Sequence, residues 1–136
     1  MPGASTPILG LTVPTVGADA NVWGGELNFD LAILDNLGAM LVTTLTTSST
    51  LGPSTFPEQY VRCICGLNPL IVGLPVPSLM NAGKAFLVKK IDSGPGVLTI
   101  VSAAGIDGQT SWIRAAQWSF LRVLSIGTAY EIIGGN

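Results

Sequence analysis

The fold is decided by the C-terminal stretch KAFLVKKIDSGPGVLTIV (residues 84–101), continued by GIDG (105–108) and SFLRVLSIGTAYEIIG (119–134). Short segments rich in Val, Ile and Leu alternate here with turns that contain Gly. Branched and aromatic side chains favour strands, whereas Gly permits the backbone angles of tight turns. The pattern therefore predicts a small β domain with antiparallel strand pairing.

Segments upstream of this stretch extend the same domain. Residues 58–65 alternate as a strand does, and residues 70–74 form a short apolar run that Pro75 and Pro77 terminate. Residues 43–50 are rich in Thr and Ser and fit either a polar strand or a linker, with β-branched Thr favouring the strand. We predict one β domain over residues 43–136, a sandwich or a barrel-like knob.

The N-terminal third has a different character. Residues 1–22 are rich in Gly, Pro and Thr, which predicts an extended arm. Residues 23–42 are predicted to form a short helix, because leucines recur in a spacing of four, three and seven. The stripe could pack on the β domain of its own chain or on symmetry mates, and its regular register favours the second. The residues predicted to mediate oligomerisation are Leu27, Leu31, Leu34 and Leu41.

Charge is scarce in this chain. Charged residues make up 10% of the sequence and apolar residues 48%, whereas an ordinary soluble domain is about 25% charged. We therefore expect other subunits to cover much of the surface, and a homotrimer is predicted. The net charge of -2 and the scattered basic residues argue against a nucleic-acid partner. The absence of His excludes a His-based catalytic triad.

The two cysteines and the long uncharged runs have plain structural explanations. Cys63 and Cys65 lie two residues apart on one predicted strand, so they are expected to be buried, reduced thiols. Residues 36–57 and 63–83 carry no charge, but the first run is rich in Thr and Ser and the second in Pro and Gly. Neither resembles a membrane-spanning helix, and the N-terminus does not resemble a secretory signal.

The carboxylates of the sequence do not indicate a catalytic site. Within the β domain Asp92, Asp107 and Glu131 could approach one another, as the two acids of a glycosidase must. Asp92 and Asp107, however, stand in Gly-rich turns, where Asp is common because it bonds to nearby backbone. We predict a protein that is not an enzyme, with no catalytic residues, no cofactor and no metal site.

Two features could instead contact a ligand. Lys89 and Lys90 are adjacent on a predicted strand, so at most one of them can join a given patch. Flat aromatic side chains bury a large area at small entropic cost and can stack on sugar rings, although in small β domains they often lie in the core or an interface. The candidate receptor contacts are Trp112, which lies in a loop-like segment, Trp118 and Tyr130.

Both ends of the chain resemble bacteriophage tail fibre and receptor-binding proteins. At the C-terminal end the resemblance lies in KKID (89–92), TI (99–100), IDG (106–108) and GTAYEIIG (127–134). At the N-terminal end it lies in LGLTVPTVG (9–17), followed by NVWGGELN (21–28). The resemblance implies a homotrimeric appendage of the virion, assembled in the host cytoplasm. Its arm would dock on other virion proteins, and its β knob could bind a glycan of the host surface.

The resemblance leaves alternatives open, because the chain lacks the repeated shaft segments usual in that family. A trimeric capsid decoration or head fibre protein would explain the short length as well. A polysaccharide-degrading tail spike and a sugar-binding lectin are further alternatives. No nucleic-acid partner and no insertion into a membrane are expected.

Overall fold

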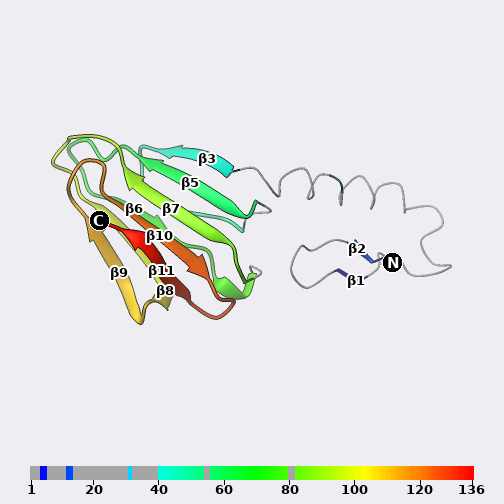
Figure 1. Ribbon diagram of the computed structural model, residues 1–136. Helices are drawn as coiled ribbons and strands as arrows, with labels where there is room; N and C mark the ends of the chain where they lie inside the picture. Colours follow the sequence, from blue (N-terminus) through cyan, green and yellow to red (C-terminus); the bar gives the residue numbers. More distant parts are fainter. Residues whose placement is uncertain (1–3, 6–11, 14–30, 32–39, 54–55, 80–81) are drawn as a thin grey trace.

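The protein is mainly β, and its strands build a nearly closed, barrel-like sheet (Figure 1). The computed structural model describes residues 4–5, 12–13, 31, 40–53, 56–79 and 82–136. Two short strands near the N-terminus, β1 (Ala4–Ser5) and β2 (Thr12–Val13), pair antiparallel with each other in a separate sheet. The predicted class, a mainly β protein with a barrel-like sheet, is confirmed.

Nine strands form the barrel-like sheet, and a 3₁₀ turn at Pro77–Leu79 follows the fourth of them. The nine strands are β3 (Met40–Leu45), β4 (Ser49–Thr50), β5 (Glu58–Cys63), β6 (Leu70–Gly73), β7 (Ala85–Lys90), β8 (Leu98–Ile106), β9 (Gln109–Arg114), β10 (Phe120–Ser125) and β11 (Tyr130–Gly135). Their order in the sheet is β3-β5-β7-β10-β11-β8-β6-β4, with β9 paired to β8 outside this path.

The first six of these strands form three β-arches, each with one strand on either wall of the barrel. The arches are β3–β4, β5–β6 and β7–β8, and they stack because strands of successive arches pair in parallel. We call β3, β5, β7 and β10 the first wall, and β4, β6, β8 and β9 the second wall. Figure 1 shows the four strands of the first wall side by side.

The last strands connect the two walls. β10 runs antiparallel to β7, and β11 runs antiparallel to β10. β11 then meets the second wall in parallel at one pair of residues, Tyr130 and Ile106. The C-terminal hairpin therefore joins the two walls along one side, while β3 and β4 are the two ends of the sheet path.

The direction of pairing differs from the antiparallel prediction. Five pairs in the barrel are parallel and three are antiparallel. The segments 64–69 and 91–97 carry the chain from the first wall to the second, although residues 92–96 were predicted to form a turn between neighbouring strands. Strands of successive arches on one wall are therefore separated in sequence by a strand of the other wall, which makes them parallel.

The core lies between the two walls. Side chains alternate between the inside and the outside along strands such as β5 and β10. Most of the inward side chains are apolar, and Gln59, Lys90 and Ser125 are buried polar exceptions. Phe86 and Tyr130 contact each other edge to face, with ring centroids 6.2 Å apart. The buried core consists of Leu51, Val61, Cys63, Cys65, Leu70, Val72, Leu74, Phe86, Val88, Leu98, Ile100, Ile106, Leu121, Val123 and Tyr130.

A polar clamp holds two neighbouring arches together where the chain crosses between the walls. The carboxylate of Asp92 accepts hydrogen bonds from the backbone N–H groups of Cys65 and Gly66, both at 2.9 Å, and of Gly94 at 3.0 Å. The segments approach so closely that a Cβ at Gly94 would lie 2.1 Å from the carbonyl oxygen of Gly66. Glycine is therefore required at this contact.

Lys90 completes the clamp from inside the barrel. Its ammonium group is fully buried and donates to the carbonyl oxygens of Asp92 at 2.7 Å and Gly94 at 2.8 Å, and to the Asp92 carboxylate at 3.2 Å. Burial alone would raise the pKa of Asp92. The donated hydrogen bonds outweigh burial and lower this pKa to about 2.

The predicted helix over residues 23–42 lies largely outside the described residues. Leu31 is helical, and residues 23–30 and 32–39 are not described. From Met40 onward the chain is strand β3, so the predicted helix end at residue 42 is wrong. The run of β-branched residues from Val42 to Thr44 explains the change, because such residues fit a pleated strand better than a helix. The strand alternative for the Thr-rich segment is thereby confirmed in β3 and β4.

Candidate functional site

The outer surface of the first wall carries exposed apolar side chains beside charged ones. Inward side chains of these strands fill the core, so the alternating positions point outward. We call their surface the outer face. It consists of Met40, Val42, Thr44, Glu58, Tyr60, Arg62, Ala85, Leu87, Lys89, Phe120, Arg122 and Leu124.

The middle of the outer face is apolar. Val42, Tyr60 and Leu87 are register partners across β3, β5 and β7, so they form one continuous row. Val42 is 57% exposed and Met40 44% exposed, while Tyr60, Leu87 and Leu124 are partly exposed. Monomeric proteins rarely leave a contiguous apolar patch in water. The outer face is therefore a candidate surface for protein association.

An ion pair crosses this face. The guanidinium of Arg122 donates to both carboxylate oxygens of Glu58, at 2.7 and 3.1 Å. These hydrogen bonds raise the pKa of Arg122. Glu58 on β5 and Arg122 on β10 lie on either side of β7, so the ion pair crosses that strand. The register partner of Glu58 on β7 is Ala85, which has a small side chain. The two parallel hydrogen bonds fix the geometry of the pair, and the charges of Arg122 and Glu58 neutralise each other.

One end of the outer face is basic and aromatic. Arg62 on β5 and Lys89 on β7 are register partners, so their side chains lie next to each other. The ammonium of Lys89 lies 5.4 Å from the centroid of the Trp118 ring. Trp118 is 53% exposed. Two cations and an indole therefore gather at this end.

Backbone contacts hold Trp118 in an unusual conformation. Its φ of 67° lies in the left-handed region, which non-glycine residues seldom adopt. Its N–H donates to the carbonyl oxygen of Lys90 at 2.8 Å. The hydroxyl of Ser119 donates to the carbonyl oxygen of Ala116 at 2.6 Å, and the Gln117 amide donates to that of Ile91 at 3.3 Å. The loop between β9 and β10 is thus fixed on both sides of the exposed indole.

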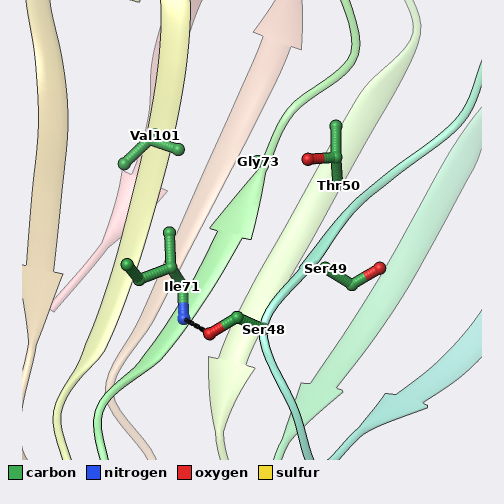
Figure 2. A pocket seen from close by; sticks show the side chains of 6 residues that line it. All are labelled: Ser48, Ser49, Thr50, Ile71, Gly73 and Val101. Carbon is green, nitrogen blue, oxygen red and sulfur yellow. Dashed lines mark hydrogen bonds between the residues drawn. The ribbon is translucent and has the colours of Figure 1, made fainter.

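A shallow hollow of about 360 Å³ lies on the second wall, beside the short strand β4. Its lining residues are Ser48, Ser49, Thr50, Ile71, Gly73 and Val101. Figure 2 shows the hydroxyl of Ser48 accepting a hydrogen bond of 2.9 Å from the N–H of Ile71. The described lining residues carry hydroxyl and methyl groups, and none of them has a titratable side chain.

The candidate receptor contacts have three different environments. Trp118 is exposed, as a receptor contact must be. Trp112 is not in a loop but in β9, partly buried against the core, and its indole N–H donates to the carbonyl oxygen of Ile106 at 3.2 Å. Tyr130 is only 1% exposed, and its hydroxyl donates to the carbonyl oxygen of Pro75 at 2.8 Å. Tyr130 is therefore a core residue, and its assignment as a receptor contact is wrong.

The predicted oligomerisation leucines are only partly described. Leu27 and Leu34 lie outside the described residues. Leu31 is 48% exposed, and Leu41 is partly buried in strand β3 and points away from the outer face. The oligomerisation stripe therefore stays a prediction from the sequence.

The other polar candidates have structural roles. Asp92 belongs to the clamp, and Asp107 accepts a hydrogen bond of 3.2 Å from the N–H of Ile132. Cys63 and Cys65 are buried and unpaired, as expected, and burial followed by the charges of Cys65 and Asp92 raises the pKa of Cys63 to about 12. A thiol of this kind is a poor nucleophile. Among the described residues, no three His, Cys, Asp or Glu side chains are grouped as metal ligands.

Comparison with known proteins gave no relatives. No protein-family model matches the chain, and no significant similarity was found to curated proteins or to solved structures. The described residues include no helix long and apolar enough to cross a membrane. The resemblance to phage tail proteins therefore remains a prediction from the motifs.

Proposed function

We propose that the protein is a structural subunit of a bacteriophage virion that acts by binding and not by catalysis. The observation that carries the proposal is the outer face, where a continuous apolar row crosses three strands of the first wall. The scarcity of charge and the motifs at both ends of the chain support the same conclusion. The knob would associate with other copies of the chain, and a homotrimer is the expected assembly.

The position of the protein in the particle follows from the same proposal. Residues 1–22 would dock on other virion proteins, and the β domain would form a short tail fibre, a tail tip or a receptor-binding appendage. A glycan of the host surface is the expected class of receptor. A trimeric capsid decoration or head fibre protein is the second candidate, because the described β domain is one barrel without a repeated shaft.

Labelling of particles tests this proposal. Antibodies against the purified chain would be applied to virions and located by electron microscopy. Label at the tail supports the appendage, and label over the capsid surface supports decoration. Purified virions that contain no copies of the chain by mass spectrometry would contradict both assignments.

A further inference from the structure

We propose that Arg62, Lys89 and Trp118 form a binding site for an anionic saccharide that carries carboxylate or phosphate groups. The proposed site specifies which residues would contact the receptor in the proposed function. It rests on that function only in so far as the chain is taken to be a binding protein. It lies at the basic end of the outer face, beside the apolar middle and on the opposite wall from the hollow.

The two cations are the first observation. Arg62 and Lys89 are register neighbours on parallel strands, so two like charges lie side by side. The ion pairs within the described residues are Lys90 with Asp92 and Arg122 with Glu58, so neither Arg62 nor Lys89 has an acidic partner there. Neighbouring unpaired cations repel each other, and one bound anionic group shared between them removes that repulsion.

The second observation is the exposed indole. Trp118 is held beside Lys89 in a left-handed conformation that ordinarily disfavours a bulky residue. Unfavourable backbone conformations persist where the surrounding structure enforces them, and they concentrate at functional positions. A rigid, half-exposed indole is a platform for the flat face of a sugar ring, because little side-chain freedom is lost on binding. The cation next to it would hold the anionic group of the same sugar.

Other anionic partners fit this surface less well. Both edges of β7 are already paired, so a peptide cannot add to Lys89 as a further strand. A nucleic acid or an anionic membrane surface is held by many cations at once, whereas this chain has six basic residues and a net charge of -2. A short acidic saccharide needs only the few groups that are present.

The test uses the full chain labelled with ¹⁵N in the indole groups. It would be titrated with a carboxylated oligosaccharide (oligogalacturonate), a phosphorylated sugar (glucose 6-phosphate), a neutral malto-oligosaccharide and inorganic phosphate. We expect the indole N–H signal of Trp118 to shift with one or both anionic sugars and not with the neutral one. Raising the salt from about 0.05 M to about 0.5 M should weaken binding, because exposed charges are screened.

Variants identify the groups that bind. Arg62→Gln, Lys89→Gln and Trp118→Ala should each weaken the affinity for the anionic sugar by about tenfold or more. Lys84→Gln is the matched control, because it removes the same charge immediately before β7, at the end of the strand far from Lys89. Its affinity should equal that of the unaltered protein.

Several outcomes would overturn the site. These are no binding of either anionic sugar, equal binding of the neutral oligosaccharide, or unchanged affinity in Arg62→Gln and Lys89→Gln. Equal affinity for inorganic phosphate with no effect of Trp118→Ala would mean an adventitious ion only. None of these results bears on whether the chain is present in virions, so the site and the proposed function can fail separately.

Discussion

At the scale of single residues, Lys89 and Lys90 show how strand alternation separates chemically identical neighbours. Lys89 lies on the outer face beside Trp118, whereas Lys90 is fully buried and holds the clamp between two arches. Their opposite orientation was predictable, because adjacent strand residues face opposite sides. The clamp was not predictable, since it depends on how closely segments 64–69 and 91–97 approach across the stacked arches.

Replacement of Lys90 should therefore destabilise the folded protein far more than replacement of Lys89. Lys90→Met removes three hydrogen bonds and leaves Asp92 without its buried ion pair. Loss of one partner of a buried pair typically costs about 3–5 kcal/mol in the free energy of unfolding. Lys89→Met should cost about 0.5 kcal/mol or less, as surface substitutions do. Urea unfolding of the two variants measures the difference, and equal losses would contradict the clamp.

Asp92 should make the stability of the protein depend on pH in the acid range. Its pKa in the folded protein is about 2, below its ordinary value of 3.8. A carboxylate with a lowered pKa contributes stability that is complete above the ordinary value and is lost as the pH falls toward the folded value. The free energy of unfolding should therefore fall between about pH 4 and about pH 2.

Asp92→Asn is the variant that isolates this contribution. It should be less stable than the unaltered protein at neutral pH and should lose less of its remaining stability between about pH 4 and about pH 2. Denaturant unfolding across this range measures both slopes. The same slope in the two proteins would show that Asp92 does not supply the pH dependence.

At the scale of elements, strand positions were more predictable than strand partners. The segments rich in Val, Ile and Leu predict strands over residues 86–91, 119–126 and 129–133, and β7, β10 and β11 lie within one or two residues of these bounds. This pattern could not reveal parallel pairing between arches, because pairing depends on where each connecting segment directs the chain. Arg62 and Lys89, 27 positions apart in the sequence, become neighbours only through that pairing. The basic end of the outer face was therefore missed.

The long strand β8 illustrates a second limit of predicting strands from the sequence pattern. The small residues and glycines of the sequence predict a loop over residues 102–108, yet the strand continues to Ile106 before the chain turns at Asp107 and Gly108. The register with β9 shifts between Val101 and Ile106, and Gly105 has a φ of 92°. Small residues around such an irregularity give no apolar alternation, so the pattern does not indicate a strand there.

The outer face should tolerate a charge in the folded chain but not in the assembly. Val42 is 57% exposed on β3, so Val42→Asp should lower the free energy of unfolding by only about 1 kcal/mol. Desolvation of the new carboxylate in an interface would cost several times that amount, on the order of 3 kcal/mol or more. Light scattering should therefore show the mass of the variant falling toward that of one chain.

Ile113→Asp is the matched control for this experiment. Ile113 is 61% exposed on β9 of the second wall, away from the outer face. The same charge placed there should leave the mass unchanged. Dissociation by Ile113→Asp, or an intact assembly in Val42→Asp, would show that the association surface lies elsewhere.

At the scale of the whole molecule, the first β-arch supplies both ends of the sheet path, β3 and β4. Residues 36–57, which contain this arch, carry no charge. Proteins commonly protect sheet edges with charged side chains, because an open edge can pair with another chain. An uncharged edge next to the apolar outer face supports the proposed association of the chain through this side of the barrel.

The most direct test of this account is the mass of the purified protein in solution, measured by light scattering over a range of concentrations. Association through the outer face predicts a mass that is a multiple of the chain mass of 14.0 kDa, and three times that value is expected. A mass of 14.0 kDa at every concentration would contradict the central claim. The outer face would then be solvent-exposed in a monomer.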